Sequence, residues 1–246
     1  LPVFNSSSIE MSLPNIEGLS EHFVYLNDDM IMFSPLTRER FFKDSLPVDF
    51  LCHGWLPRNK LFDLLRGRDT WINSLNNNIR LVNRELRQNH LKNKHLYNQS
   101  YSFLEKLSNF LMFNIYKRFF WFEHWHLPQP YLRKTLLEVK NKFAKEMSLC
   151  SKNRFRSNTD LTQYLYRYWH LAKGEFYPIK HDDGIEDNIC SIEDLNNMIN
   201  RCEKEKPKFI CFNDSPALSD LDYEIIKNKI IFYLDKNFPE KASFEL

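Results

Sequence analysis

Short apolar runs alternate along this chain with longer segments in which apolar residues recur at helical spacing. Residues 23–26 and 209–212 each hold four consecutive apolar, β-prone side chains, a pattern typical of buried strands. The alternation predicts an α/β fold in one domain, 1–246, with a mixed or mostly parallel sheet flanked by helices and a helical insertion at 69–125. Helical spacing and capping residues predict helices at five places: 69–120, 131–147, after Thr159-Asp160, from Ser191 to about Cys202, and 218–238.

Composition fits a folded globular protein and excludes several kinds of site. The 246 residues carry a formal net charge of +2, with 43% hydrophobic and 27% charged residues, which excludes disorder. The five glycines form neither a G-x-G-x-x-G turn nor a P-loop, so phosphate has to be held by side chains and metal. Five cysteines without a C-x-x-C pair indicate a reducing cytosol rather than a disulfide framework or a zinc site. No apolar run approaches the ~18–20 residues of a membrane span.

Charge is unevenly distributed along the chain. Residues 58–118 hold twelve Lys/Arg and four Asp/Glu, whereas residues 182–246 hold fifteen acidic and eight basic residues. Two solvated faces would account for this asymmetry. The alternative is a basic surface that faces an anionic partner, such as lipid head groups, a phosphate-bearing polymer or nucleic acid.

Both predicted strands are followed by an Asn-Asp pair, 27–28 and 213–214, and the first pair is extended by Asp29. If the two strands are parallel neighbours, these side chains emerge together at the carboxyl ends, where open α/β sheets bind ligands. Carboxylate and amide oxygens suit Mg²⁺ or Mn²⁺ that holds a diphosphate. The alternative is that each Asn-Asp pair only begins a turn.

Two further residues are candidates for a polar site. His126 lies two residues before Pro128, and a rigid turn there can aim an imidazole. Arg156 can bind a phosphate through two hydrogen bonds, or it is simply exposed to solvent. The aromatic run 119–122 is interpreted as core, with a membrane-interface belt beside Lys117 and Arg118 as the alternative.

Three sets of segments follow one another along the chain: 2–10, 16–20 and 23–29; then His126-Leu-Pro128 with Phe155-Arg156 and Asp160; then 208–214 with 244–246. In this order they resemble the second, third and fourth shared blocks of the Stealth proteins, which include bacterial capsular polysaccharide phosphotransferases and the α/β subunit of the animal GlcNAc-1-phosphotransferase. No counterpart of the family's first shared block is present, so the chain resembles the carboxyl-terminal portion of a longer enzyme.

The resemblance implies a nucleotide-sugar transferase-like catalytic domain. It would transfer a sugar-1-phosphate from a nucleotide sugar, a UDP-hexose or UDP-N-acetylhexosamine, to an acceptor hydroxyl and release the nucleoside monophosphate. Asp29 is the expected general base, with Asp28 as the alternative base or a metal ligand. His126 and Arg156 are expected to hold the diphosphate. The other expected residues are Asn213 and Asp214 as ligands of Mg²⁺ or Mn²⁺, and Asn5, Glu10, Asn27 and Asp160 as substrate-binding or orienting groups.

The expected acceptor is a capsular polysaccharide or oligosaccharide, carried on a lipid at the cytoplasmic face of the membrane. The expected location is therefore the cytoplasm, with peripheral membrane contact and no nucleic acid as a partner. Two other functions remain open from the sequence. One is a metal-dependent glycosyltransferase that releases a nucleoside diphosphate, because Asn-Asp-Asp resembles its D-x-D motif. The other is a non-catalytic module that binds polysaccharide or membrane.

Overall fold

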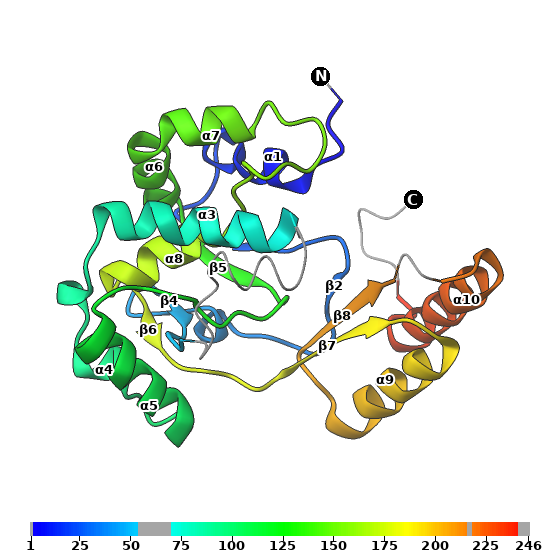
Figure 1. The fold of residues 1–246 in the computed structure, drawn as a ribbon. Coiled ribbons are helices and arrows are strands. Elements are labelled where there is room, and N and C mark those ends of the chain that lie inside the picture. Colours follow the sequence, from blue (N-terminus) through cyan, green and yellow to red (C-terminus); the bar gives the residue numbers. More distant parts are fainter. Residues whose placement is uncertain (1, 54–69, 216–217, 241–246) are drawn as a thin grey trace. The chain divides into compact units, whose positions relative to one another are not determined.

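The computed structural model describes residues 2–53, 70–215 and 218–240, and it confirms the α/β class (Figure 1). The chain divides into two compact units, and the prediction of one domain stays a prediction. Unit 1 consists of Leu1–Tyr25, Thr37–His124 and Gln129–Asp182, and unit 2 of Leu26–Leu36, Trp125–Pro128 and Asp183–Leu246.

Two small sheets belong to unit 1. In the first, β1 (His22–Tyr25) pairs antiparallel with β5 (Gln129–Leu132). In the second, β4 (Leu46–Asp49) lies between β3 (Phe42–Lys43), which is antiparallel to it, and β6 (Tyr177–Pro178), which is parallel. The arrangement considered for 23–26 and 209–212, in which both are parallel strands, does not occur, because β1 pairs antiparallel with β5.

Unit 1 contains far more helix than strand. The predicted helix over 69–120 is interrupted after Glu85, and the one over 131–147 begins as strand β5. The elements are α1 (Ser6–Glu10), η1 (Leu13–Asn15), η2 (Arg38–Arg40), α3 (Thr70–Glu85), η3 (Gln88–His90), α4 (Asn93–Leu96), α5 (Phe103–Leu111), the π-helical turn η4 (Met112–Tyr116), α6 (Arg133–Lys142), α7 (Ala144–Cys150) and α8 (Tyr164–Lys173).

Helix α8 is the centre of unit 1. Every residue from Tyr164 to Ala172 is buried, as expected for a helix enclosed on all sides. Its Arg167 is 1% exposed and binds Asp49, with Nη2 at 2.7 Å from Oδ1 and Nε at 2.9 Å from Oδ2. Nε2 of His170 lies 2.9 Å from the same Oδ2. A buried charge is tolerable only when it is paired in this way, so Asp49 ties α8 to strand β4.

Unit 2 is a three-stranded sheet with two helices. The strand order is β2 (Met30–Met32), β8 (Phe209–Asp214), β7 (Gly184–Ile189), with β2 antiparallel and β7 parallel to β8. Helices α9 (Ile192–Glu205) and α10 (Asp220–Asn237) pack on one face of this sheet (Figure 1). The predicted cap of α9 is confirmed, because Ser191 Oγ accepts from Asp194 N at 3.1 Å. Leu221, an apolar residue in the first turn of α10, is 72% exposed.

Several smaller expectations are also settled by the structure. The described part of the chain contains no helix long and apolar enough to cross a membrane. All five cysteines are free thiols. Phe119 and Phe122 are buried, which confirms the core interpretation of the aromatic run. Asp160 does not cap α8, whose N-cap is Gln163.

Candidate functional site

Side-chain alternation gives the sheet of unit 2 an apolar face and a polar face. Ile185, Ile189 and Ile210 point into the core formed with α9 and α10. The intervening residues point to the opposite face. There Glu186 is paired with Cys211, and Asn188 with Asn213. We call this side, on which neither α9 nor α10 packs, the open face of the sheet.

Asp29 and His126 meet on the open face. Oδ2 of Asp29 lies 3.0 Å from Nε2 of His126, and the ligand atoms of Asp29, His126 and Cys211 lie within 4.8 Å of one another. The side chains of His126 and Asp29 are 33% and 24% exposed. Nδ2 of Asn27 lies 3.3 Å from the same imidazole nitrogen. A partly exposed imidazole paired with a carboxylate is suited to proton transfer.

Backbone hydrogen bonds fix the position of Asp29. A turn closes from Asn27 to Met30, whose N–H donates to the Asn27 carbonyl at 3.2 Å. The N–H of Phe212 donates to the carbonyl of Asp29, also at 3.2 Å. The Asn-Asp-Asp segment therefore lies beside the middle of β8. Residues 28 and 29 also form a turn, as the alternative interpretation of the Asn-Asp pair expected.

Two residues of β7 position the segment that carries His126. The backbone N–H of His126 donates to Oε2 of Glu186. Leu127 is 5% exposed and packs so closely on Gly184 that a Cβ at Gly184 would overlap its Cδ1. A side chain at Gly184 would therefore require the buried side chain of Leu127 to move.

The electrostatics of the open face favour a charged Asp29 beside His126. Burial by itself would raise the pKa of Asp29, but the hydrogen bond and the charge of His126 lower it below its ordinary value. Burial of the carboxyl group raises the pKa of Glu186, although part of that side chain is exposed. Burial also raises the pKa of Cys211, so this residue remains a thiol.

The residues around Asp29 fit a hard divalent cation. Oδ1 of Asp29 is buried and accepts no hydrogen bond from a nitrogen or hydroxyl group of the described residues, while the thiol of Cys211 interacts with the carboxylate. A carboxylate oxygen of this kind, together with the amide oxygen of Asn27, is a suitable ligand for Mg²⁺ or Mn²⁺. The thiol of Cys211 is a soft ligand that requires deprotonation, so it does not fit such an ion.

The structure separates the predicted ligands Asn213 and Asp214. Asn213 is exposed on the open face, where its Nδ2 donates to Oδ1 of Asn188 at 2.5 Å. Asp214, the next residue, points to the other face by alternation. Asp28 is exposed in the turn. Metal binding by these three residues stays a prediction, and the geometry favours Asn213 over Asp214.

Asn5 and Asp160, two of the expected substrate-binding or orienting residues, contact each other in unit 1. Nδ2 of Asn5 lies 3.0 Å from Oδ2 of Asp160, and the two residues are 1% and 2% exposed. Asp160 also accepts from the N–H of Ser157 at 2.8 Å. These bonds hold the loop that carries the exposed Arg156.

Glu10 has a similar internal role in unit 1. Its Oε2 accepts from the N–H of Gln163, the N-cap of α8, at 2.7 Å, and its backbone carbonyl accepts from the hydroxyl of Tyr166. At 6% exposure it supports α8. Direct substrate binding by Asn5, Glu10 and Asp160 stays a prediction.

Sequence reasoning missed Glu186, Cys211 and Gly184. Glu186 is one of many acidic residues in the carboxyl-terminal third, and nothing local distinguishes it. Cys211 is visible only as an apolar position of a strand. The close approach of Gly184 to Leu127 involves residues far apart in the chain, so no local pattern reveals it.

Comparison with known proteins gives the family of this chain. Residues 1–48 match Stealth protein CR2, conserved region 2, and residues 125–172 match Stealth protein CR3, conserved region 3. The chain is 33% identical over 252 residues to the capsular polysaccharide phosphotransferase WcwK of Streptococcus pneumoniae, covering 100% of the chain and 70% of the relative. The chain belongs to the Stealth family.

Other Stealth relatives give the same result. The chain is 32% identical over 249 residues to the exopolysaccharide phosphotransferase cps2G of Lactiplantibacillus plantarum, covering 100% of the chain and 69% of the relative. It is 28% identical over 255 residues to the receptor polysaccharide phosphotransferase WefC of Streptococcus gordonii, covering 100% and 71%. The Stealth resemblance and the prediction of an enzyme that transfers phosphate-containing groups are confirmed. Asp29 lies in the matched region 2, and His126 lies in the matched region 3.

Proposed function

We propose that this Stealth protein transfers a sugar-1-phosphate from a nucleotide sugar to a hydroxyl of a saccharide acceptor. The observation that carries the proposal is the contact between Asp29 and His126, at 3.0 Å, because it joins the two matched family regions in one polar site. Relatives named capsular, exopolysaccharide and receptor polysaccharide phosphotransferases support a polysaccharide substrate.

In the proposed reaction the acceptor hydroxyl oxygen attacks the phosphorus that adjoins the sugar. A bond forms between this oxygen and phosphorus, and the bond from phosphorus to the bridging oxygen of the diphosphate breaks. The bridging oxygen leaves with the nucleoside monophosphate. The hydroxyl proton passes to the enzyme, and negative charge builds on the phosphoryl oxygens and the leaving phosphate.

The Asp29–His126 pair is the proposed proton acceptor. With Nε2–H of His126 donating to Oδ2 of Asp29, the carboxylate orients the ring and stabilises the imidazolium that forms when the ring takes up the proton. The alternative from the sequence, in which Asp29 itself is the base, uses the same pair with the roles exchanged. Variants of the two residues distinguish these assignments, as described in the Discussion.

A divalent cation, Mg²⁺ or Mn²⁺, is proposed as the cofactor. Oδ1 of Asp29 and the amide oxygen of Asn27 would hold it, with Asp28 and Asn213 as further oxygen ligands. The ion would neutralise charge on the diphosphate. Arg156, exposed in unit 1, is proposed to bind a phosphate through its guanidinium group.

The proposed donor is a UDP-hexose or UDP-N-acetylhexosamine, and the proposed acceptor is a growing capsular or exopolysaccharide chain. An acceptor carried on a lipid would place the reaction at the cytoplasmic face of the membrane. A nucleotide sugar and a saccharide account for the substrates, so nucleic acid has no part in the reaction.

A product assay tests the proposal. The protein is incubated with Mg²⁺, an acceptor oligosaccharide and a panel of UDP-sugars, and the released nucleotide is identified by chromatography. Nucleoside monophosphate that depends on the acceptor is the expected product. Nucleoside diphosphate would instead mean cleavage of the sugar–oxygen bond by a glycosyltransferase, and it would overturn the proposed attack at phosphorus.

A further inference from the structure

Helix α5 buries two polar side chains and exposes several apolar ones, and the π-helical turn η4 after it exposes two more apolar side chains while burying Met112. Ser108 and Asn109 are 1% and 0% exposed, although both are polar. Phe103 and Ile115, by contrast, are 77% and 63% exposed. A surface helix of a globular protein normally has the opposite arrangement, so this orientation requires an explanation.

Hydrogen bonds fix the buried side of this helix. Nδ2 of Asn109 donates to the carbonyl oxygens of Leu51 and Leu96, both at 2.8 Å. Oγ of Ser108 donates to the carbonyl oxygen of His53 at 2.6 Å. Because these buried groups are satisfied only in this orientation, rotation of α5 to bury its apolar side would leave them unpaired. The outward apolar side is therefore a fixed feature of unit 1.

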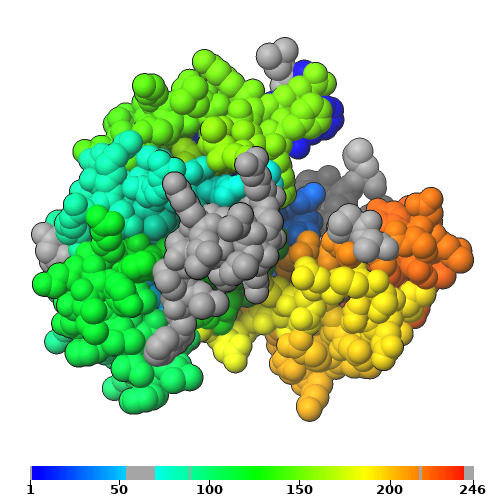
Figure 2. Space-filling model, viewed as in Figure 1, coloured from blue at the N-terminus to red at the C-terminus, as the bar shows by residue number. Residues whose placement is uncertain are grey.

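The outward apolar side chains form one stripe. Positions 103, 104, 107, 110 and 111 recur at helical spacing, and η4 continues the stripe. Contiguous exposed apolar side chains mark a surface that binds a protein, a ligand or a membrane. It forms part of the outer surface of unit 1 (green in Figure 2). Its most exposed members are Phe103 (77%), Leu104 (61%), Phe110 (48%), Ile115 (63%) and Tyr116 (55%).

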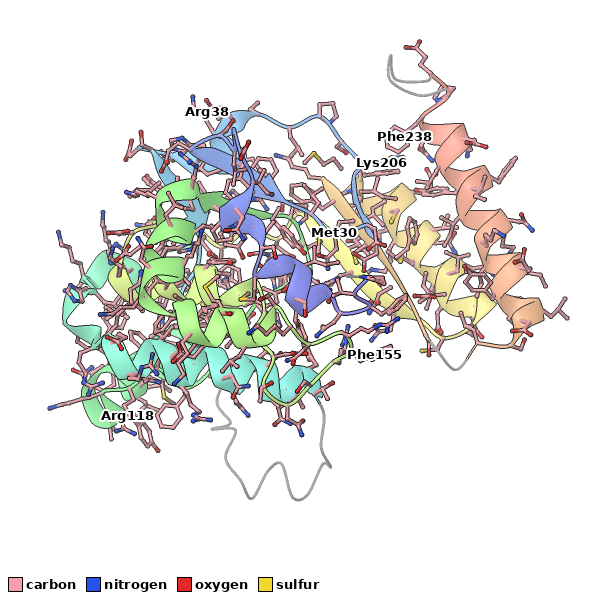
Figure 3. All side chains as sticks on the ribbon, turned by 90° about the horizontal axis from the view of Figure 1, so that it is seen from above. Met30, Arg38, Arg118, Phe155, Lys206 and Phe238 are labelled. Atoms are coloured by element: carbon pink, nitrogen blue, oxygen red, sulfur yellow. The ribbon has the colours of Figure 1, made fainter. Side chains whose placement is uncertain are left out.

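Basic residues predominate in the part of the chain that carries the stripe. Residues 86–122 hold six Lys/Arg and one acidic residue, Glu105. Glu105 and the neighbouring Glu123 are both ion-paired with Lys180. Lys117 and Arg118 are exposed immediately after η4, and Arg118 lies at the outer edge of the unit in Figure 3. Exposed apolar and aromatic side chains bordered by cations match the interface of an anionic bilayer, where rings enter the head-group region and cations meet phosphate.

We propose that α5 and η4 dock this protein onto an anionic lipid bilayer, with the apolar stripe inserted at the interface and the basic residues against the head groups. Docking is a property of unit 1 and is independent of the proposed phosphoryl transfer. A failure of one proposal therefore leaves the other to be judged separately.

Sedimentation with vesicles tests the docking surface. The probes are vesicles of equal parts phosphatidylglycerol and phosphatidylcholine, and vesicles of phosphatidylcholine alone. We expect binding to the first that weakens as salt is raised. The variant Phe103→Ser/Leu104→Ser/Ile115→Ser is expected to lose at least about tenfold in partitioning. The matched control is Leu221→Ser/Phe232→Ser on α10, whose side chains are 72% and 73% exposed; it is expected to bind like the wild type.

Three results would overturn the docking proposal. They are no binding of wild-type protein to anionic vesicles, equal binding by the triple variant, and equal loss in the α10 control. Analytical ultracentrifugation of both variants tests a second copy of the chain as the occupant, and wild-type dimers that dissociate in the triple variant would assign the stripe to self-association instead. Circular dichroism confirms folding, and phosphotransfer to a soluble acceptor is expected to be unchanged in the triple variant.

Discussion

Asp29 and His126 are 97 residues apart in the chain, yet Oδ2 of one lies 3.0 Å from Nε2 of the other. The contact rests on two independent anchors. The backbone of Asp29 is bonded to Phe212 in β8, and the backbone of His126 is bonded to Glu186 in β7. The parallel pair β7–β8 thus sets the relative position of the two functional groups.

Removing either member of this pair is expected to reduce kcat. Asp29→Asn and His126→Gln should each lower it by about 100-fold or more, because each removes one part of a proton-transfer unit. The double variant should be little worse than the worse single variant, since residues that act as a unit are not additive. Steady-state kinetics with folding checked by circular dichroism measures this.

The control for these variants is Asp187→Asn. Asp187 lies on β7, and its carboxylate is ion-paired with Arg201 rather than with His126. It should keep activity within a few-fold of the wild type. If His126→Gln lost far less activity than Asp29→Asn, Asp29 itself would be the base, as the sequence alone suggested.

Glu186 is expected to act by positioning His126. Its carboxylate accepts the His126 N–H, and the amide oxygen of glutamine can accept the same bond. Glu186→Gln should therefore retain activity, whereas Glu186→Ala should lower kcat about tenfold with a smaller change in KM. Equal loss in both variants would indicate that the charge of Glu186, rather than its hydrogen bond, is what matters.

Gly184→Ala is expected to displace the segment that carries His126. The new methyl group would overlap the side chain of Leu127, and a shift of this segment changes the aim of the imidazole. We expect kcat to fall about tenfold while most of the stability remains.

Gly18→Ala is the control for Gly184→Ala, because it strains the backbone without displacing a neighbouring side chain. Gly18 has φ +71° and no atom within 4 Å of a new Cβ, so alanine costs about 1 kcal/mol of backbone strain and should leave kcat unchanged. Thermal unfolding and kinetics of both variants check this pair. A loss of activity in Gly18→Ala comparable to that in Gly184→Ala would contradict the assigned roles.

Acid is expected to destabilise the protein through His53. Burial lowers the pKa of this residue from 6.5 to about 4. Between these values the unfolded chain binds the proton and the folded chain does not, so stability falls as pH falls from 6.5 towards 4. The loss is on the order of 3 kcal/mol. Melting temperatures measured across this range should drop less steeply in His53→Gln than in the wild type.

The matched control is His90→Gln, a change at an exposed histidine. It should leave the pH dependence of the melting temperature as it is in the wild type. If both variants retained the wild-type slope, His53 would not be responsible for the acid sensitivity.

Arg156 is expected to contribute to donor binding. Arg156→Gln should raise KM for the nucleotide sugar about tenfold by removing a charged hydrogen bond to phosphate. Arg154→Gln is the control, because the Arg154 guanidinium stacks on the rings of Phe4 and Phe155. An unchanged KM in Arg156→Gln would remove this residue from the proposed site.

The sequence by itself determined the local structure and the chemistry available. Four-residue apolar runs correctly predicted strands at 23–26 and 209–212, and the Ser191 cap correctly predicted the start of α9, because these signals act within a few residues. The family blocks likewise selected Asp29 and His126, which the structure brings together.

Only the tertiary structure decided which strands are neighbours and which side chains share a face. Any strand offers the same backbone donors and acceptors, so the sequence did not reveal that β1 pairs with β5 while Asp29 lies beside β8. The same holds for the selection of Glu186 and for the separation of Asn213 from Asp214. The outward apolar stripe of α5 also follows from long-range bonds, since Asn109 is satisfied by carbonyl groups that only the folded chain places around it.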